Sequence, residues 1–240
     1  MITAEFILLV LLSLHPYYTD KETKEERTAR MTTVANAIDT ASSRATCTEP
    51  YTQDECKPIW TGSKRQLALL LVTKAWWESR LAKHIHEGNC GPTECDATRV
   101  GNVIVHKART IWQMQRTGLL KEWEWDNMDG TDYKSTRTAA WAATRILARG
   151  KRKCQHPHGV LSYYATSRCR WSGAGKRYLF FTKLSKKTRE QLEQEADRLF
   201  TAKDKGRTPP PSGGVKGKQF SQNLLPPRRE HHSLSPHSSE

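Results

Sequence analysis

Residues 63–85 read SKRQLALLLVTKAWWESRLAKHI and form the longest apolar pattern of the chain. On a helix that turns by about 100° per residue, the leucines and Trp77 form one apolar stripe. Glu78 falls inside that stripe. The pattern predicts a helix over residues 63–85 that ends at EGNCG, where glycine and cysteine interrupt it. This helix therefore carries a carboxylate on its buried face.

Helical periodicity also dominates the rest of the chain. Few runs alternate with period two, so we predict an all-α fold. A glycine- and cysteine-rich loop is expected over residues 87–101, and a second loop over EWEWDNMDGTDY, residues 122–133. The further predicted helices cover residues 1–17, 20–44, 102–117, 134–149 (ended by Gly150), 156–168, 176–182 and 185–203.

Changes in composition along the 240 residues predict four regions. Residues 1–62 are expected to be N-terminal helices that pack on a core domain of residues 63–184. A polar helix follows over residues 185–207. Residues 208–240 are rich in proline, serine and basic residues, and they cannot bury enough apolar surface to offset the entropy of ordering. We therefore interpret that tail as disordered.

The net charge of +14 is concentrated in one block. Residues 145–187 contain twelve lysines and arginines and no acidic residue. Such a block predicts non-specific binding of an anionic polymer, such as nucleic acid or an acidic cell wall, through the block itself and the basic tail. The run FILLVLLSL, residues 6–14, is too short to cross a bilayer, which takes roughly 20 apolar residues. Because no basic residue precedes it, we favour a buried first helix over a signal peptide.

Six cysteines allow fifteen disulfide connectivities. Pairing of nearest neighbours would give Cys47–Cys56, Cys90–Cys95 and Cys154–Cys169, and would imply an oxidising environment. A structural zinc site is the alternative. The segments HIHEGNCGPTEC and CQHPH each bring histidines and cysteines, which are common zinc ligands, close together in the sequence. Their spacing matches no common zinc pattern, so we expect no metal.

Glu78 has two explanations at this point. Burial disfavours an ionised carboxylate, which would raise the pKa of Glu78 and let it act as a general acid. Alternatively, Glu78 pairs with an arginine in a structural salt bridge. Helix geometry alone favours the salt bridge.

Three motifs bear on this choice. AWWESRLA, with Glu78 followed by Ser79, resembles the Glu-Ser motif of the lysozyme-like superfamily, in particular the lytic transglycosylases, where a helix ends at Glu-Ser. Thr110-Ile111-Trp112-Gln113 resembles the family's Gly-Leu-Trp-Gln, with threonine in place of glycine. SYYAT, residues 162–166, resembles Ala-Tyr-Asn-Ala-Gly, with Tyr163 at the tyrosine position and without the asparagine and the final glycine. The resemblance covers residues 63–182.

The resemblance implies cleavage of the β-1,4 bond between N-acetylmuramic acid and N-acetylglucosamine in peptidoglycan, without a cofactor. Glu78 would protonate the leaving oxygen and then accept a proton from the muramic acid 6-hydroxyl, which closes an anhydro ring. Ser79, Trp112, Gln113 and Tyr163 form the implied substrate-binding set, and Ser79 would also stabilise the turn after the helix.

Two alternatives stay open. A hydrolytic lysozyme would use water and a second carboxylate, for which Glu94, Asp96 and Asp126 are candidates. A nucleic-acid-binding protein would explain the charge but not Glu78. An enzyme with disulfides and no clear signal peptide is expected outside the cytoplasm, at the cell wall or carried in a phage particle.

Overall fold

The computed structural model describes residues 2–14, 22–51, 56–90, 95, 97–101, 103–116 and 119–204. In these ranges the chain forms nine helices and two small antiparallel sheets, which confirms the predicted all-α class. The predicted tail, residues 208–240, lies outside the described residues. The helices are α1 (Ala4–Leu12), α2 (Lys24–Thr46), α3 (Lys64–Ser79), α4 (Lys83–His86), α5 (Glu122–Asp126), α6 (Tyr133–Cys154), α7 (Pro157–Thr166), α8 (Ala174–Lys186) and α9 (Arg189–Asp204).

Local capping defines where the long helices begin. At the start of α2, Thr23 and Glu26 form a capping box, in which each side chain accepts a hydrogen bond from the other residue's backbone N–H. Ser63 accepts a hydrogen bond from the N–H of Gln66 and begins α3. Asp132 caps α6 in the same way. These polar residues satisfy backbone donors that a helix start leaves without partners.

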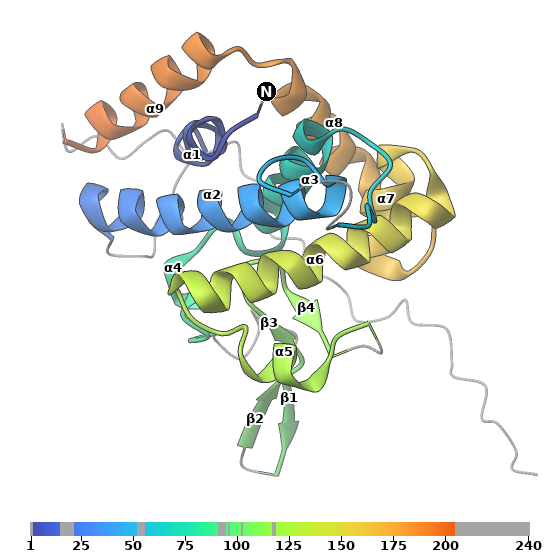
Figure 1. Ribbon diagram of the computed structural model, residues 1–240. Coiled ribbons are helices and arrows are strands. Elements are labelled where there is room, and N and C mark those ends of the chain that lie inside the picture. Colours follow the sequence, from blue (N-terminus) through green and yellow to red (C-terminus); the bar gives the residue numbers. More distant parts are fainter. Residues whose placement is uncertain are drawn as a thin grey trace, which may run out of the picture. The chain divides into compact units, whose positions relative to one another are not determined.

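Helix α3 lies at the centre of the first compact unit, residues 1–201 (Figure 1), and contacts α1, α2, α6 and α8. All residues from Leu67 to Ala75 are buried, so this part of α3 is enclosed on every side and not along one stripe. One apolar cluster includes Ile7 of α1, Met31 of α2 and Leu147 of α6 together with the leucines of α3. The side chains around α3 thus come from both ends of the described chain.

The structure corrects the predicted helix over residues 63–85. It breaks after Ser79, because Arg80 and Leu81 have φ values of +54° and +56°, which a right-handed helix cannot contain. The chain then resumes as the short helix α4. The helix end at Glu-Ser therefore agrees with the motif, whereas the periodicity alone overestimated the length of the helix.

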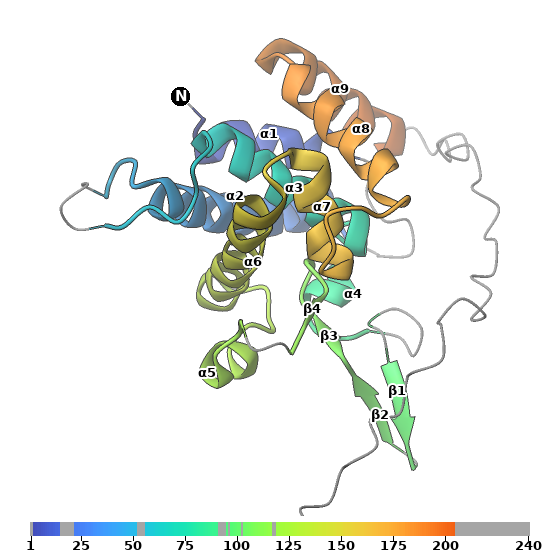
Figure 2. The same cartoon turned by 90° about the vertical axis from the view of Figure 1, so that its right-hand side faces the viewer.

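The predicted helix over residues 102–117 is wrong. This segment contains strands of two hairpins, in which β1 (Ala97–Val100) pairs with β2 (Val103–His106) and β3 (Ala108–Arg109) pairs with β4 (Met114–Gln115). Gly101 has a φ of +61° at the tip of the first hairpin, a conformation that glycine adopts without strain. In Figures 1 and 2 the β1–β2 hairpin extends away from the helices.

Smaller differences concern individual boundaries. The apolar helix α1 is shorter than the predicted 1–17, and Pro16 lies outside the described residues. The predicted loop over residues 122–133 contains α5, and α8 is longer than the predicted 176–182. Gly150 does not end α6. A Cβ atom there would lie 3.2 Å from the ring of Tyr163, so a larger residue would require that ring to shift by a few tenths of an ångström where α7 packs closely on α6.

Candidate functional site

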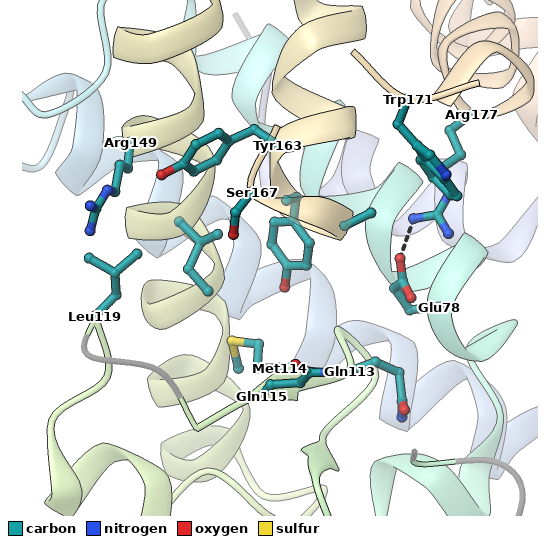
Figure 3. Close-up of a pocket in the computed structure, with 13 residues that line it drawn as sticks. Glu78, Gln113, Met114, Gln115, Leu119, Arg149, Tyr163, Ser167, Trp171 and Arg177 are labelled. Carbon is teal, nitrogen blue, oxygen red and sulfur yellow. Dashed lines mark hydrogen bonds and ion pairs between the residues drawn. The ribbon is translucent and has the colours of Figure 1, made fainter. Parts of the chain in front are cut away.

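A pocket of about 590 Å³ opens beside the C-terminal end of α3 (Figure 3). Glu78 lines it from α3, Arg149 from α6, Tyr163 from α7 and Arg177 from α8, and the β3–β4 turn contributes Gln113. In Figure 3 Glu78 and Arg177 point toward one another, with Trp171 beside them, and Arg149 lies far from Glu78. Five separate parts of the chain therefore converge on one cavity.

The end of α3 positions Glu78. The hydroxyl of Ser79 donates to the carbonyl of Ala75 (2.8 Å) and accepts the N–H of Leu81 (3.1 Å). These bonds hold the left-handed turn at Arg80 and Leu81, at which α3 ends. Glu78 thus lies in the last turn of a buried helix, with about a fifth of its side chain exposed.

Two cations hold one oxygen of Glu78. Lys74 Nζ, one helical turn earlier, and Arg177 Nη1 both donate to Oε1. No described group donates to Oε2, and protein does not enclose that atom. The salt bridge that helix geometry favoured is therefore present, and the second carboxylate oxygen remains accessible from the pocket.

The expected increase in the pKa of Glu78 is wrong for the free pocket. Burial does raise the pKa of this carboxyl, but the charges of Lys74 and Arg177 and their hydrogen bonds outweigh it. The net pKa is below its usual range, so Glu78 is ionised at neutral pH. To act as an acid, Glu78 must lose part of this stabilisation when substrate binds.

Lys74 is completely buried below the pocket. Its ammonium contacts Glu78 and lies 4.1 Å from the centre of the Tyr164 ring. Burial, opposed by the charge of Glu78, lowers the pKa of Lys74 to about 8. A buried ammonium with one carboxylate partner is therefore the central electrostatic feature of the site.

This pKa predicts a pH dependence of stability. Between pH 8 and the ordinary lysine pKa of 10.5, the unfolded chain binds a proton at Lys74 that the folded chain has released. Stability rises with pH wherever the unfolded state binds more protons. We therefore expect urea unfolding at pH 8, 9 and 10 to show that wild type gains stability relative to Lys74→Met. The exposed Lys183→Met serves as the control, and a constant difference between wild type and Lys74→Met would contradict the low pKa.

Among the residues predicted to bind substrate, Gln113 and Tyr163 line the pocket. Trp112 and Ser79 do not. Trp112 is fully buried, and its indole donates to the carbonyl of Leu71 (3.0 Å), which ties the β3–β4 turn to α3. The pocket therefore contains two of the four residues, and the other two support its walls.

Thr110 occupies the position of the glycine in the resembled motif. Its φ is +66°, in the left-handed region that favours glycine, and its hydroxyl accepts the N–H of Trp112 (3.2 Å). Gln113, at φ +48°, completes the same tight turn by donating its N–H to the carbonyl of Thr110. The backbone at Thr110 therefore has the left-handed conformation that the glycine of the resembled motif would adopt without strain.

The conformation of Thr110 can be tested by substitution. Thr110→Gly and Thr110→Ala both remove the hydroxyl, but only alanine keeps a Cβ in the left-handed region, which costs roughly 1–2 kcal/mol. After allowance for the greater entropy of glycine in the unfolded chain, Thr110→Gly should be about 1 kcal/mol more stable than Thr110→Ala in urea unfolding. The reverse order would contradict a left-handed turn.

Sequence reasoning missed Arg177 and Tyr164. The hydroxyl of Tyr164 donates to the carbonyl of Trp112 (3.1 Å), so this side chain connects α7, the β3–β4 turn and Lys74 of α3. Arg177 lies 5.0 Å from the Trp171 ring. A Cβ on Gly173 would clash with that ring, so the ring packs directly against the residue that precedes α8.

A second carboxylate is absent from the described lining of the pocket, where Glu78 is the one acidic residue. Asp126 is exposed and lies outside the pocket. Glu94 and Asp96 are outside the described residues.

All six cysteines form disulfides, in the nearest-neighbour pairing Cys47–Cys56, Cys90–Cys95 and Cys154–Cys169. No thiolate is therefore available for the zinc site considered as an alternative. Disulfides form and persist in oxidising environments. None of the described helices is long and apolar enough to cross a membrane.

Comparisons with protein-family models, with curated proteins and with solved structures find no match to this chain. The function must therefore be inferred from the pocket and the motifs around it.

Proposed function

We propose that this protein cleaves the β-1,4 glycosidic bond between N-acetylmuramic acid and N-acetylglucosamine in peptidoglycan, as a lytic transglycosylase with Glu78 as its acid and base. One observation carries the proposal. Glu78, Gln113 and Tyr163, from three separate sequence motifs, line a single pocket in which Glu78 is the one described acidic residue.

The environment of Glu78 supports a proton-transfer role. Lys74 and Arg177 both hold Oε1, so Oε2 is the oxygen that can reach a substrate in the pocket. When protonated there, Glu78 would donate to the leaving glycosidic oxygen, which departs with the bonding electron pair. The carboxylate would then accept the proton of the muramic acid 6-hydroxyl as that oxygen closes the anhydro ring.

The walls of the pocket support a sugar substrate. Its volume of about 590 Å³ is within the usual range for ligand pockets, roughly 300–1,000 Å³. The rings of Tyr163 and Trp171 offer flat faces on which sugar rings can stack. Arg149 and Arg177 give the lining a positive charge, which suits a polymer rich in carboxylates and phosphates.

The test is digestion of purified peptidoglycan by wild type and Glu78→Gln, with mass spectrometry of the released fragments. We expect wild type to release anhydro-muramyl ends and the variant to release almost none. Products heavier by one water would assign a hydrolytic lysozyme in place of a transglycosylase. Equal release by both proteins, or none by wild type, would refute the proposal.

A further inference from the structure

Arg177 has unused hydrogen-bonding capacity at the pocket. Its Nη1 donates to Oε1 of Glu78, whereas no described group accepts from Nη2 or Nε, and neither nitrogen is enclosed by protein. The guanidinium carbon lies 5.0 Å from the centre of the Trp171 ring and 6.0 Å from that of Trp77. A guanidinium binds a carboxylate most strongly through two parallel hydrogen bonds. Arg177 therefore presents a carboxylate-binding group that its contact with Glu78 only partly uses.

The two cations at Glu78 differ in their freedom to move. Lys74 is completely buried against the ring of Tyr164 and does not line the pocket. Arg177 is about one-eighth exposed and lines the pocket. If an anion enters the pocket, Arg177 is the cation that can leave Glu78 and bind the anion instead.

We propose that Arg177 makes cleavage depend on a carboxylate carried by the glycan, which draws the guanidinium away from Glu78 and so releases the catalytic carboxyl for proton transfer. This inference rests on the proposed function. The carboxylate comes from one of two sources in peptidoglycan, the lactyl group of N-acetylmuramic acid or the peptide stem. A neutral glycan leaves Arg177 in place and Glu78 ionised.

The proton balance of this step is complete. After Arg177 has turned, Glu78 keeps Lys74 as its one cationic partner and takes a proton from solvent at Oε2. That proton passes to the glycosidic oxygen as the bond to C1 breaks, and the 6-hydroxyl returns a proton when its oxygen bonds to C1. The other charged or titratable groups that line this pocket or act on the pair are Tyr163 and Tyr164 on α7, Arg149 on α6, and Arg80, whose charge acts on Arg177. None of them forms a hydrogen bond with Glu78 among the described residues.

A rate comparison on three substrates of equal glycan length tests the inference. These are muramyl glycan with free lactyl carboxylates, muramyl glycan with peptide stems, and a neutral chitooligosaccharide. We expect kcat/KM of wild type to favour at least one muramyl glycan over the chitooligosaccharide by roughly tenfold or more. The muramyl glycan with the higher kcat/KM identifies the source of the carboxylate. Arg177→Gln should reduce the preference to within about threefold and raise the rate on the chitooligosaccharide.

The pH profile separates this role from a structural one. Without Arg177, Glu78 keeps its proton to higher pH. The alkaline limb of the kcat/KM profile on the chitooligosaccharide should therefore shift to higher pH in Arg177→Gln. Arg152→Gln removes the same charge from an exposed position of α6 outside the pocket and should leave both preference and profile unchanged. An unchanged preference and profile in Arg177→Gln would overturn the inference.

A binding experiment distinguishes failure of this inference from failure of the proposed function. N-acetylmuramic acid and N-acetylglucosamine differ by the lactyl carboxylate, and the Glu78 carboxyl can be followed by ¹³C NMR with Glu78→Gln as the assignment control. We expect the pKa of Glu78 to rise on addition of N-acetylmuramic acid or of an N-acetylmuramyl peptide, according to the source of the carboxylate, but not of N-acetylglucosamine, and to be insensitive to all three in Arg177→Gln. No change with any of the three compounds would overturn the exchange at Arg177. A change with either muramyl compound in a protein that does not cleave peptidoglycan would refute the proposed function alone.

Discussion

Glu78→Gln is expected to lower the rate of peptidoglycan cleavage by about 10²–10⁴-fold, the range for loss of a general acid or base. Glutamine keeps the shape of the side chain, but it neither donates the proton to the glycosidic oxygen nor accepts one from the 6-hydroxyl. Initial rates of fragment release measure the effect. Glu122→Gln is the matched control, because Glu122 is three-quarters exposed and pairs with Arg116 outside the pocket.

The same substitution also affects folding, because it leaves the buried Lys74 without its carboxylate partner. Breaking a buried ion pair on one side costs about 3–5 kcal/mol, and release of the Lys74 proton, favoured by its pKa of about 8, limits this cost. The double variant Lys74→Met/Glu78→Gln removes both charges. We expect the double variant to regain stability in urea unfolding without regaining activity, and recovery of activity would show that Glu78 is only a structural ion-pair partner.

Trp112→Ala is expected to lower the free energy of unfolding by about 3–5 kcal/mol, the cost of removing a large buried aromatic side chain. Trp112 is fully buried, its indole binds the carbonyl of Leu71, and its own carbonyl accepts the hydroxyl of Tyr164. Loss of the indole therefore leaves a cavity and removes the hydrogen bond that ties the β3–β4 turn to α3, whereas the backbone carbonyl that binds Tyr164 remains. Urea unfolding measures the effect, and cleavage should fall as well, because Gln113 loses its support.

Trp112→Phe separates packing from substrate contact. It keeps most of the buried ring and loses the hydrogen bond to Leu71, which costs about 1–3 kcal/mol when a buried partner is left unsatisfied. Because the indole does not line the pocket, cleavage by the folded variant should stay near that of wild type. A large loss of activity with unchanged stability would instead support the substrate-binding role that the sequence predicted for Trp112.

Helices with strong local signals were predictable from the sequence. The start of α2 has its capping box within four residues, and α7 begins with His156 as its cap and Pro157 at its first position. The region of residues 97–115 was misread, because its strands are short and the left-handed residues among its described positions, Gly101, Thr110 and Gln113, include two that rarely adopt that conformation.

Part of the candidate site was also predictable, because short local motifs mark it. The Glu-Ser motif marked Glu78 and the end of α3, and the two later motifs marked Gln113 and Tyr163. Trp112 was predicted to bind substrate, because the motif does not indicate which of its side chains face the core. That orientation follows from the turn between Thr110 and Gln113, which places Trp112 against Leu71.

By itself, the sequence determined the helical class, the capped helix starts and the presence of a carboxylate near the end of a buried helix, because these depend on residues within a few positions of one another. The tertiary structure alone decided the charge state of that carboxylate. Arg177 lies 99 residues from Glu78 in the chain, and its contact, together with the burial of Lys74, reverses the expected direction of the pKa shift. Burial and charge partners act through space, so the direction of the pKa shift at Glu78 is decided only by the packing of α3 against α8.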